Sequence, residues 1–267
     1  MLISGLRWFF AIAAVLAFIA GILLFVLAAE TDRFFSWTIE PPLTAAFVGA
    51  AYWAACVLLT WAARQRRWAW ARTALPPVFV IAVLLLIATL IRLEKFDLDS
   101  LFGWFWLVVY IAVPPLVVYL VVEQTRREGR APPRERTRPL NLWARGILAV
   151  QAASLLALGG ALYVIPETAD ALWPWTLTPL TAEAIGSFLI GFGVAAAYAL
   201  LEDDLELLRG PALAYAVLGA LELAALAIHS DDVTADGAWV ALYAAFWVTV
   251  LAAGLYGLIE RSAAARS

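Results

Sequence analysis

Eight long apolar stretches constrain the fold of this sequence more than any other feature. They cover approximately residues 8–29, 43–63, 74–91, 103–122, 146–165, 181–201, 211–229 and 238–259. A helix needs about 20 apolar residues to cross the hydrocarbon core of a bilayer. Charged residues make up only 15% of the chain, against about 25% in a soluble domain. The sequence therefore predicts an all-α integral membrane protein with eight transmembrane helices.

The distribution of basic residues predicts the orientation of these helices. With the N-terminus in the cytoplasm, 15 of the 18 Lys and Arg residues fall in cytoplasmic segments, and only Arg33, Arg92 and Lys95 fall outside. Cytoplasmic loops carry an excess of basic residues, so both termini are expected in the cytoplasm. The composition, rich in Ala and in Arg with a single Lys, indicates a bacterial protein. We therefore expect a multi-pass protein of the bacterial plasma membrane.

The two halves of the sequence share features at a spacing of 137–138 residues, which indicates an internal duplication. Arg7, Gly21 and Trp37 correspond to Arg145, Gly159 and Trp175, and a motif of the form W-T-[IL]-x-P-x-T follows each Trp with one residue deleted in the second copy. We expect two tandem four-helix repeats, 1–122 and 146–267. Because each has an even number of spans, the repeats should enter the membrane in the same orientation, related by a pseudo-two-fold axis along the membrane normal.

A polar segment, 123–145, joins the two halves. It holds seven Arg and three Pro residues and very few aliphatic ones, so it cannot bury a core and is expected to be a flexible cytoplasmic linker. One interpretation is that its arginines bind anionic lipid headgroups, each contributing about 1 kcal/mol near the surface. The other is a solvated linker that only enforces topology.

The repeated motif places tryptophans at the outer ends of two spans. In the second copy Thr178 can cap a helix while Pro179 takes its first position, where a missing N–H is harmless. The simpler interpretation is a helix start with an interfacial aromatic anchor. The alternative is that Trp37, Trp173 and Trp175 face one another across the pseudo-axis and form an aromatic mouth for an apolar or amphipathic ligand.

One acidic residue, Glu222, lies deep within a span. An ionisable residue at that depth should face the bundle interior and have a partner. Tyr215 and His229 share its helix face at intervals of seven residues, although members of the row are about 10.5 Å apart and cannot bond directly. One interpretation is a proton or cation relay. The alternative is a protonated Glu222 bonded to Gln151 or Ser154, with His229 exposed at the interface.

Charged residues at the expected cytoplasmic and outer span ends have simpler interpretations. The cytoplasmic loops of the two halves carry opposite charges, which predicts that Arg64, Arg66 and Arg67 pair with Glu202, Asp203 and Asp204 across the pseudo-axis and close that face. Near the outer start of its span, Glu183 is expected to offset the positive end of the helix dipole.

The sequence contains few groups able to carry catalysis. With one Cys (Cys56), one His and no metal, phosphate or nucleophile motif, it predicts no cofactor and argues against an enzyme. A net charge of −3 argues against nucleic-acid binding. We expect a small permease or channel-like protein with a cavity between its repeats. The alternative is a non-transporting accessory or scaffold subunit that binds lipid or another membrane protein.

Overall fold

The computed structural model describes residues 1–128 and 137–264, and every regular element in these ranges is a helix. The long helices are α1 (Ser4–Gly21, continued by a π-helical turn Ile22–Val26), α3 (Pro42–Ala63), α5 (Leu75–Ile91), α6 (Leu101–Glu128), α7 (Leu142–Val164), α9 (Pro179–Glu202), α10 (Arg209–Ile228) and α11 (Gly237–Ala264). Three short helices connect them: α2 (Thr31–Phe34), α4 (Trp68–Ala71) and α8 (Pro166–Ala169).

The eight expected spans are confirmed as helices long and apolar enough to cross a membrane. Some extend beyond the expected bounds. Because α6 continues to Glu128 and α7 begins at Leu142, the segment predicted as a linker, 123–145, is helical at both ends, and residues 129–136 lie outside the described ranges. The Arg-rich stretch after Val122 continues the helix because Glu, Gln and Arg are good helix formers.

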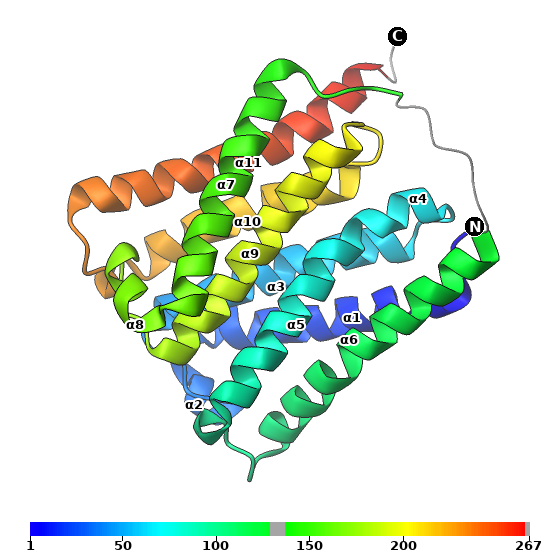
Figure 1. Ribbon diagram of the computed structural model, residues 1–267. Helices are drawn as coiled ribbons and strands as arrows, with labels where there is room; N and C mark the ends of the chain where they lie inside the picture. Colours follow the sequence, from blue (N-terminus) through cyan, green and yellow to red (C-terminus); the bar gives the residue numbers. More distant parts are fainter. Residues whose placement is uncertain (129–136, 265–267) are drawn as a thin grey trace.

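The helices form one bundle whose two ends carry different elements (Figure 1). The start of α1, the end of α11 and α4 lie at one end, which we call the terminal end. The short helices α2 and α8 lie at the other, which we call the loop end. Helices α3 and α9 touch at the centre and are the most enclosed spans. Around them α1 packs on α3, α7 on α9, α10 on α3, α5 on α9, α6 on α5 and α11 on α10.

The crossing of α7 and α9 depends on two glycines. A Cβ added at Gly159 would lie 2.9 Å from the carbonyl oxygen of Gly186, and one added at Gly186 would lie 2.7 Å from that of Gly159. In a membrane the hydrophobic effect does not drive helices together, so their association depends on close packing. Small residues allow the two backbones to approach closely. Gly186 belongs to a run of small residues in the sequence of α9, and its partner Gly159 comes from the preceding span.

Both Pro-containing motifs begin helices at the loop end, but their N-termini are satisfied differently. In α9 the Thr178 hydroxyl accepts from the N–H of Thr181, and the Thr181 hydroxyl accepts from that of Thr178, a reciprocal capping box around Pro179. In α3, which begins at Pro42, the N–H of Leu43 donates to Asp232 Oδ2 at 2.8 Å. A carboxylate from the loop between α10 and α11 therefore caps α3.

Candidate functional site

Glu222, in the middle of α10, is enclosed by protein. The residue is 1% exposed, and neither of its carboxylate oxygens has a hydrogen-bond partner. The Tyr243 hydroxyl of α11 is near enough to this carboxyl group to interact with it, but the two form no hydrogen bond of normal geometry. Glu222 thus faces the interior rather than lipid, and its polar neighbour is Tyr243 of α11.

The residues expected to join Glu222 have other positions. Gln151 is buried and donates from Nε2 to Thr249 Oγ1 at 3.2 Å, so the expected bond to Glu222 does not form. Ser154 is exposed. Tyr215 is buried and donates to the carbonyl oxygen of Phe192 at 2.9 Å, while His229 is half-buried at the end of α10. As their spacing predicts, the three residues on α10 form no direct hydrogen bond with one another.

The motif tryptophans are buried, which corrects both the interfacial anchor and the shared mouth. Trp37 packs against Phe35, Phe96 and Trp106. Trp173 and Trp175 pack against Tyr243 in a different cluster. Trp175 is 1% exposed, and its Nε1 donates to Thr44 Oγ1 of α3 at 2.8 Å. The indoles are inside because the loops before α3 and α9 fold back over the bundle rather than lying in the interface.

Two adjoining pockets open at the loop end, beside the ring cluster of Trp173, Trp175 and Tyr243. The outer one, which we call the vestibule, has a volume of about 670 Å³ and polar groups from Thr176, Thr234 and Asp236. The deeper one, the aromatic pocket, has a volume of about 500 Å³ between α7 and α11. Trp173, Trp239 and Leu242 line both. The pair therefore joins a polar pocket at the loop end to an apolar one beside it.

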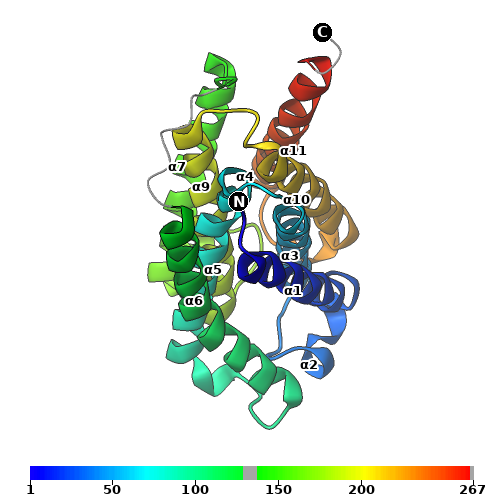
Figure 2. The ribbon, with the colours of Figure 1, turned by 90° about the vertical axis from the view of Figure 1, so that its right-hand side faces the viewer.

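A third pocket, the alanine pocket, also lies beside α7 and α11 but nearer the terminal end. Its volume is about 280 Å³, and its walls come from α7, α9, α10 and α11, including Ala195, Ala199 and Tyr215. Asn141 and Tyr256, hydrogen-bonded to each other at 2.7 Å, stand at its terminal end. Between the alanine and aromatic pockets, the Gln151–Thr249 bond joins α7 to α11. Figure 2 shows the ends of these two helices diverging at the terminal end.

A further pocket, the acidic pocket, lies between the two motif loops at the loop end. It has a volume of about 750 Å³, and Asp32, Glu40 and Asp232 are among its lining residues. None of these carboxylates belongs to a group of three or more candidate ligands able to hold a metal ion in the described ranges. Beneath this opening α3 and α9 are in contact.

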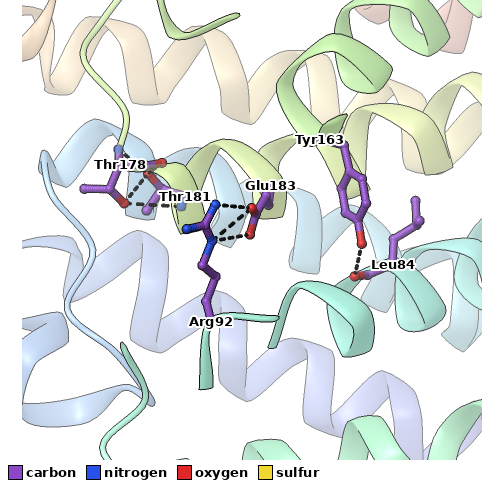
Figure 3. A network of polar contacts seen from close by, with 6 residues as sticks. All are labelled: Leu84, Arg92, Tyr163, Thr178, Thr181 and Glu183. Carbon is purple, nitrogen blue, oxygen red and sulfur yellow. Dashed lines mark hydrogen bonds and ion pairs between the residues drawn. The ribbon is translucent and has the colours of Figure 1, made fainter. Parts of the chain in front are cut away.

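A polar network at the loop end ties α5 to α9 (Figure 3). Arg92 donates to Glu183 through Nη2 at 2.9 Å and through Nε at 3.1 Å. This hydrogen bonding raises the pKa of the Arg92 guanidinium above its ordinary value. Nearby, the Tyr163 hydroxyl donates to the carbonyl oxygen of Leu84 at 2.8 Å, which links α7 to α5. Glu183 therefore has an ion-pair partner in addition to its favourable place in the first turns of α9.

At the terminal end, the acidic residues have different partners from those expected. Glu202 pairs with Arg72 at 2.8 Å, and Asp203 pairs with Arg145 at 2.6 Å. Asp204 accepts from the N–H groups of Thr137 and Arg138. Within the described ranges, the ion pairs include none from Arg64, Arg66 or Arg67, which corrects that prediction. Arg72 lies closer because α4 carries it back toward α9, whereas the three arginines occupy the turn itself.

Sequence reasoning missed the residues of α11 that complete the site. Tyr243, Trp247 and Thr249 look like ordinary members of an apolar span, and only 3.6-residue periodicity could have placed Tyr243 and Trp247 on an inward face. The partner of Glu183 could have been predicted from the sequence, because Arg92 is one of only three basic residues expected at that end of the bundle.

Comparison of the chain with protein-family models, with curated proteins and with solved structures gives no significant match.

Proposed function

We propose that this chain is a small permease whose substrate path runs along the seam between α7 and α11. The observation that carries the proposal is that the aromatic and alanine pockets lie along this seam at two depths, with the Gln151–Thr249 hydrogen bond between them. Alternating access needs a site that can be opened to either side by moving packed helices against each other. Two pockets at different depths, with the Gln151–Thr249 bond joining α7 to α11 between them, meet that need.

The pocket chemistry suits an amphipathic substrate. The walls of both pockets in the seam are overwhelmingly apolar, and the vestibule adds Thr and Asp side chains at the loop end. Ligand sites typically combine an apolar lining of this kind with a few polar groups that fix orientation. The path would thus lie within the second half of the chain. The sequence had suggested a cavity between the two halves instead.

We further propose that the chain consists of two tandem four-helix repeats in parallel orientation. Four ring contacts support this, because each recurs 137–138 residues further along the chain: Phe35–Trp37 as Trp173–Trp175, Phe35–Trp106 as Trp173–Tyr243, Trp37–Trp106 as Trp175–Tyr243, and Trp106–Tyr110 as Tyr243–Trp247. A backbone bond recurs likewise, from Asp97 to Ser36 and from Thr234 to Pro174. Under this proposal the first repeat is 1–122 and the second 146–267.

The proposed setting is the bacterial plasma membrane, with the terminal end in the cytoplasm. The basic residues support it, since Arg7, Arg64, Arg72 and Arg145 all belong to segments at the terminal end. The arginines between α6 and α7 would then meet anionic headgroups of the inner leaflet. Several of them lie at 129–136, outside the described residues.

A second candidate function is a non-transporting accessory subunit. The contact of α3 with α9 at the centre of the bundle, where the two halves meet, favours it. In that case the pockets of the seam would hold a lipid or a partner's side chains permanently.

Thiol labelling from the two sides of the membrane tests the permease. Single cysteines would replace Leu158 in the aromatic pocket and Ile147 in the alanine pocket of a Cys56→Ser protein, with Val108 on the exposed face of α6 as control. We expect a membrane-impermeant reagent to reach residue 158 from the loop side and residue 147 from the terminal side. Labelling no faster than at residue 108 would refute a path along the seam.

A further inference from the structure

The walls of the aromatic pocket carry several ring faces and edges in close mutual contact. Trp173 and Tyr243 have ring centroids 5.7 Å apart, and Tyr243 and Trp247 have centroids 6.0 Å apart, each pair edge to face. Trp239 and Phe246 complete the aromatic lining. The face of an aromatic ring carries partial negative charge, so grouped rings attract cations such as quaternary ammonium groups.

Beside this pocket, the carboxyl group of Glu222 has the Tyr243 hydroxyl as its polar neighbour and no basic partner among the described residues. It is buried, it has no hydrogen-bond partner, and Tyr243, the polar residue that interacts with it, is itself a pocket wall. A buried carboxyl group takes up a proton unless a charge or donor partner stabilises its ionised form. Tyr243 connects the two, because it interacts with Glu222 and lines the aromatic pocket.

The surroundings favour a cation over an anion. Neither the vestibule nor the aromatic pocket has a Lys or Arg among its lining residues, and Asp236 stands in the vestibule. The acidic pocket next to it adds Asp32, Glu40 and Asp232 at the same end of the bundle. Of the three basic residues at this end, Arg92 and Arg33 are paired with Glu183 and Glu30, and Lys95 lines none of these three pockets. The field along the approach is therefore negative, which concentrates cations at the opening.

We infer that the aromatic pocket binds a lipophilic organic cation, an ammonium or phosphonium centre on an apolar body, with Glu222 as its counter-charge. The inference rests on the proposed function, since it names the class of substrate for that path. A pocket of about 500 Å³ is within the range that holds drug-sized ligands. The apolar body would lie against Leu155 and Leu158, and the charged centre would lie among the rings near Tyr243.

Binding of tetraphenylphosphonium to the detergent-solubilised full chain tests the inference, with tetraphenylborate as the ligand of the same shape and opposite charge. Tryptophan fluorescence reports binding, because Trp173, Trp239 and Trp247 line the pocket. We expect the cation to bind more tightly than the anion. Glu222→Gln should weaken cation binding by about 10-fold to 100-fold and remove the preference, whereas Glu222→Asp, which keeps the charge, should retain the preference.

Glu94→Gln is the matched control, because it removes an exposed carboxylate at the same end of the bundle and should leave both affinities unchanged. If Glu222→Gln fails to fold, Trp247→Leu tests the cage instead and should weaken cation binding by about tenfold. Equal affinities for the two ions, or a preference that survives Glu222→Gln, would overturn the inference. Labelling of residues 147 and 158 needs no ligand, so that outcome would leave the permease standing, while failed labelling would remove the permease itself.

Discussion

Removing Arg92 from its ion pair with Glu183 should destabilise the bundle more than removing Glu183. Glu183 is the more enclosed partner, with its side chain 6% exposed against 27% for Arg92. Two unit charges about 4 Å apart attract by about 4 kcal/mol at the effective dielectric constant of a protein surface, and desolvation offsets part of this. We therefore expect a coupling of about 1–3 kcal/mol between the two side chains.

The two single substitutions distinguish the partners. Arg92→Gln leaves a carboxylate buried without its cation and should cost about 2–3 kcal/mol, less than the full 3–5 kcal/mol of a completely buried pair. Glu183→Gln leaves a partly solvated guanidinium and should cost about 1 kcal/mol. Denaturation of the micelle-bound protein, followed by tryptophan fluorescence, measures both values and their double-mutant cycle. Equal single effects, or additivity within about 0.5 kcal/mol, would refute the asymmetric ion pair.

Three further predictions concern packing and capping. Gly186→Leu should destabilise the protein by at least about 1–3 kcal/mol because its side chain would meet the backbone of α7, whereas Gly160→Leu, in open space, should change stability little; similar losses in the two would argue against the close crossing. Trp175→Phe keeps an aromatic ring but removes the pyrrole part of the indole together with its bond to Thr44, so it should cost at least about 1–2 kcal/mol by the same denaturation assay, and no change would show that this bond contributes nothing. Thr178→Ala should cost about 1 kcal/mol through loss of the cap, with Thr178→Ser as the conservative control, and an equally destabilised Ser variant would exclude the cap as the cause.

Much of the fold could be predicted from the sequence because the bilayer imposes helix length and apolar composition directly. The positions of eight spans, the cap at Thr178 and the start of α3 at Pro42 all depend on local signals. Side-chain partners across helices were much less predictable. Trp175 carries the same local signals as an interfacial anchor, and only the return of its loop over the bundle brings it to Thr44.

The candidate site shows the same division. The burial of Glu222 follows from the cost of placing an ionisable group in lipid. Its neighbour could not be chosen from spacing, because Gln151, Ser154 and Tyr243 were all available at suitable depth and the choice depends on which spans adjoin α10. That helix packs on α11 and α3, so Tyr243 meets Glu222 while Gln151 meets Thr249.

The movement of α7 against α11 is the most direct test of the proposed permease. Spin labels would be attached in a Cys56→Ser protein at Ala157 and Leu242 beside the aromatic pocket, and in a second protein at Ala144 and Ala253 beside the alanine pocket. A pair on the closely packed helices α1 and α3 serves as the rigid control. Electron–electron double resonance in lipid nanodiscs should give two distances for each pair across the seam, with one end widening as the other narrows, and one distance for the control. A single narrow distance at both ends of the seam, unchanged when tetraphenylphosphonium is added, would contradict alternating access and favour the accessory subunit.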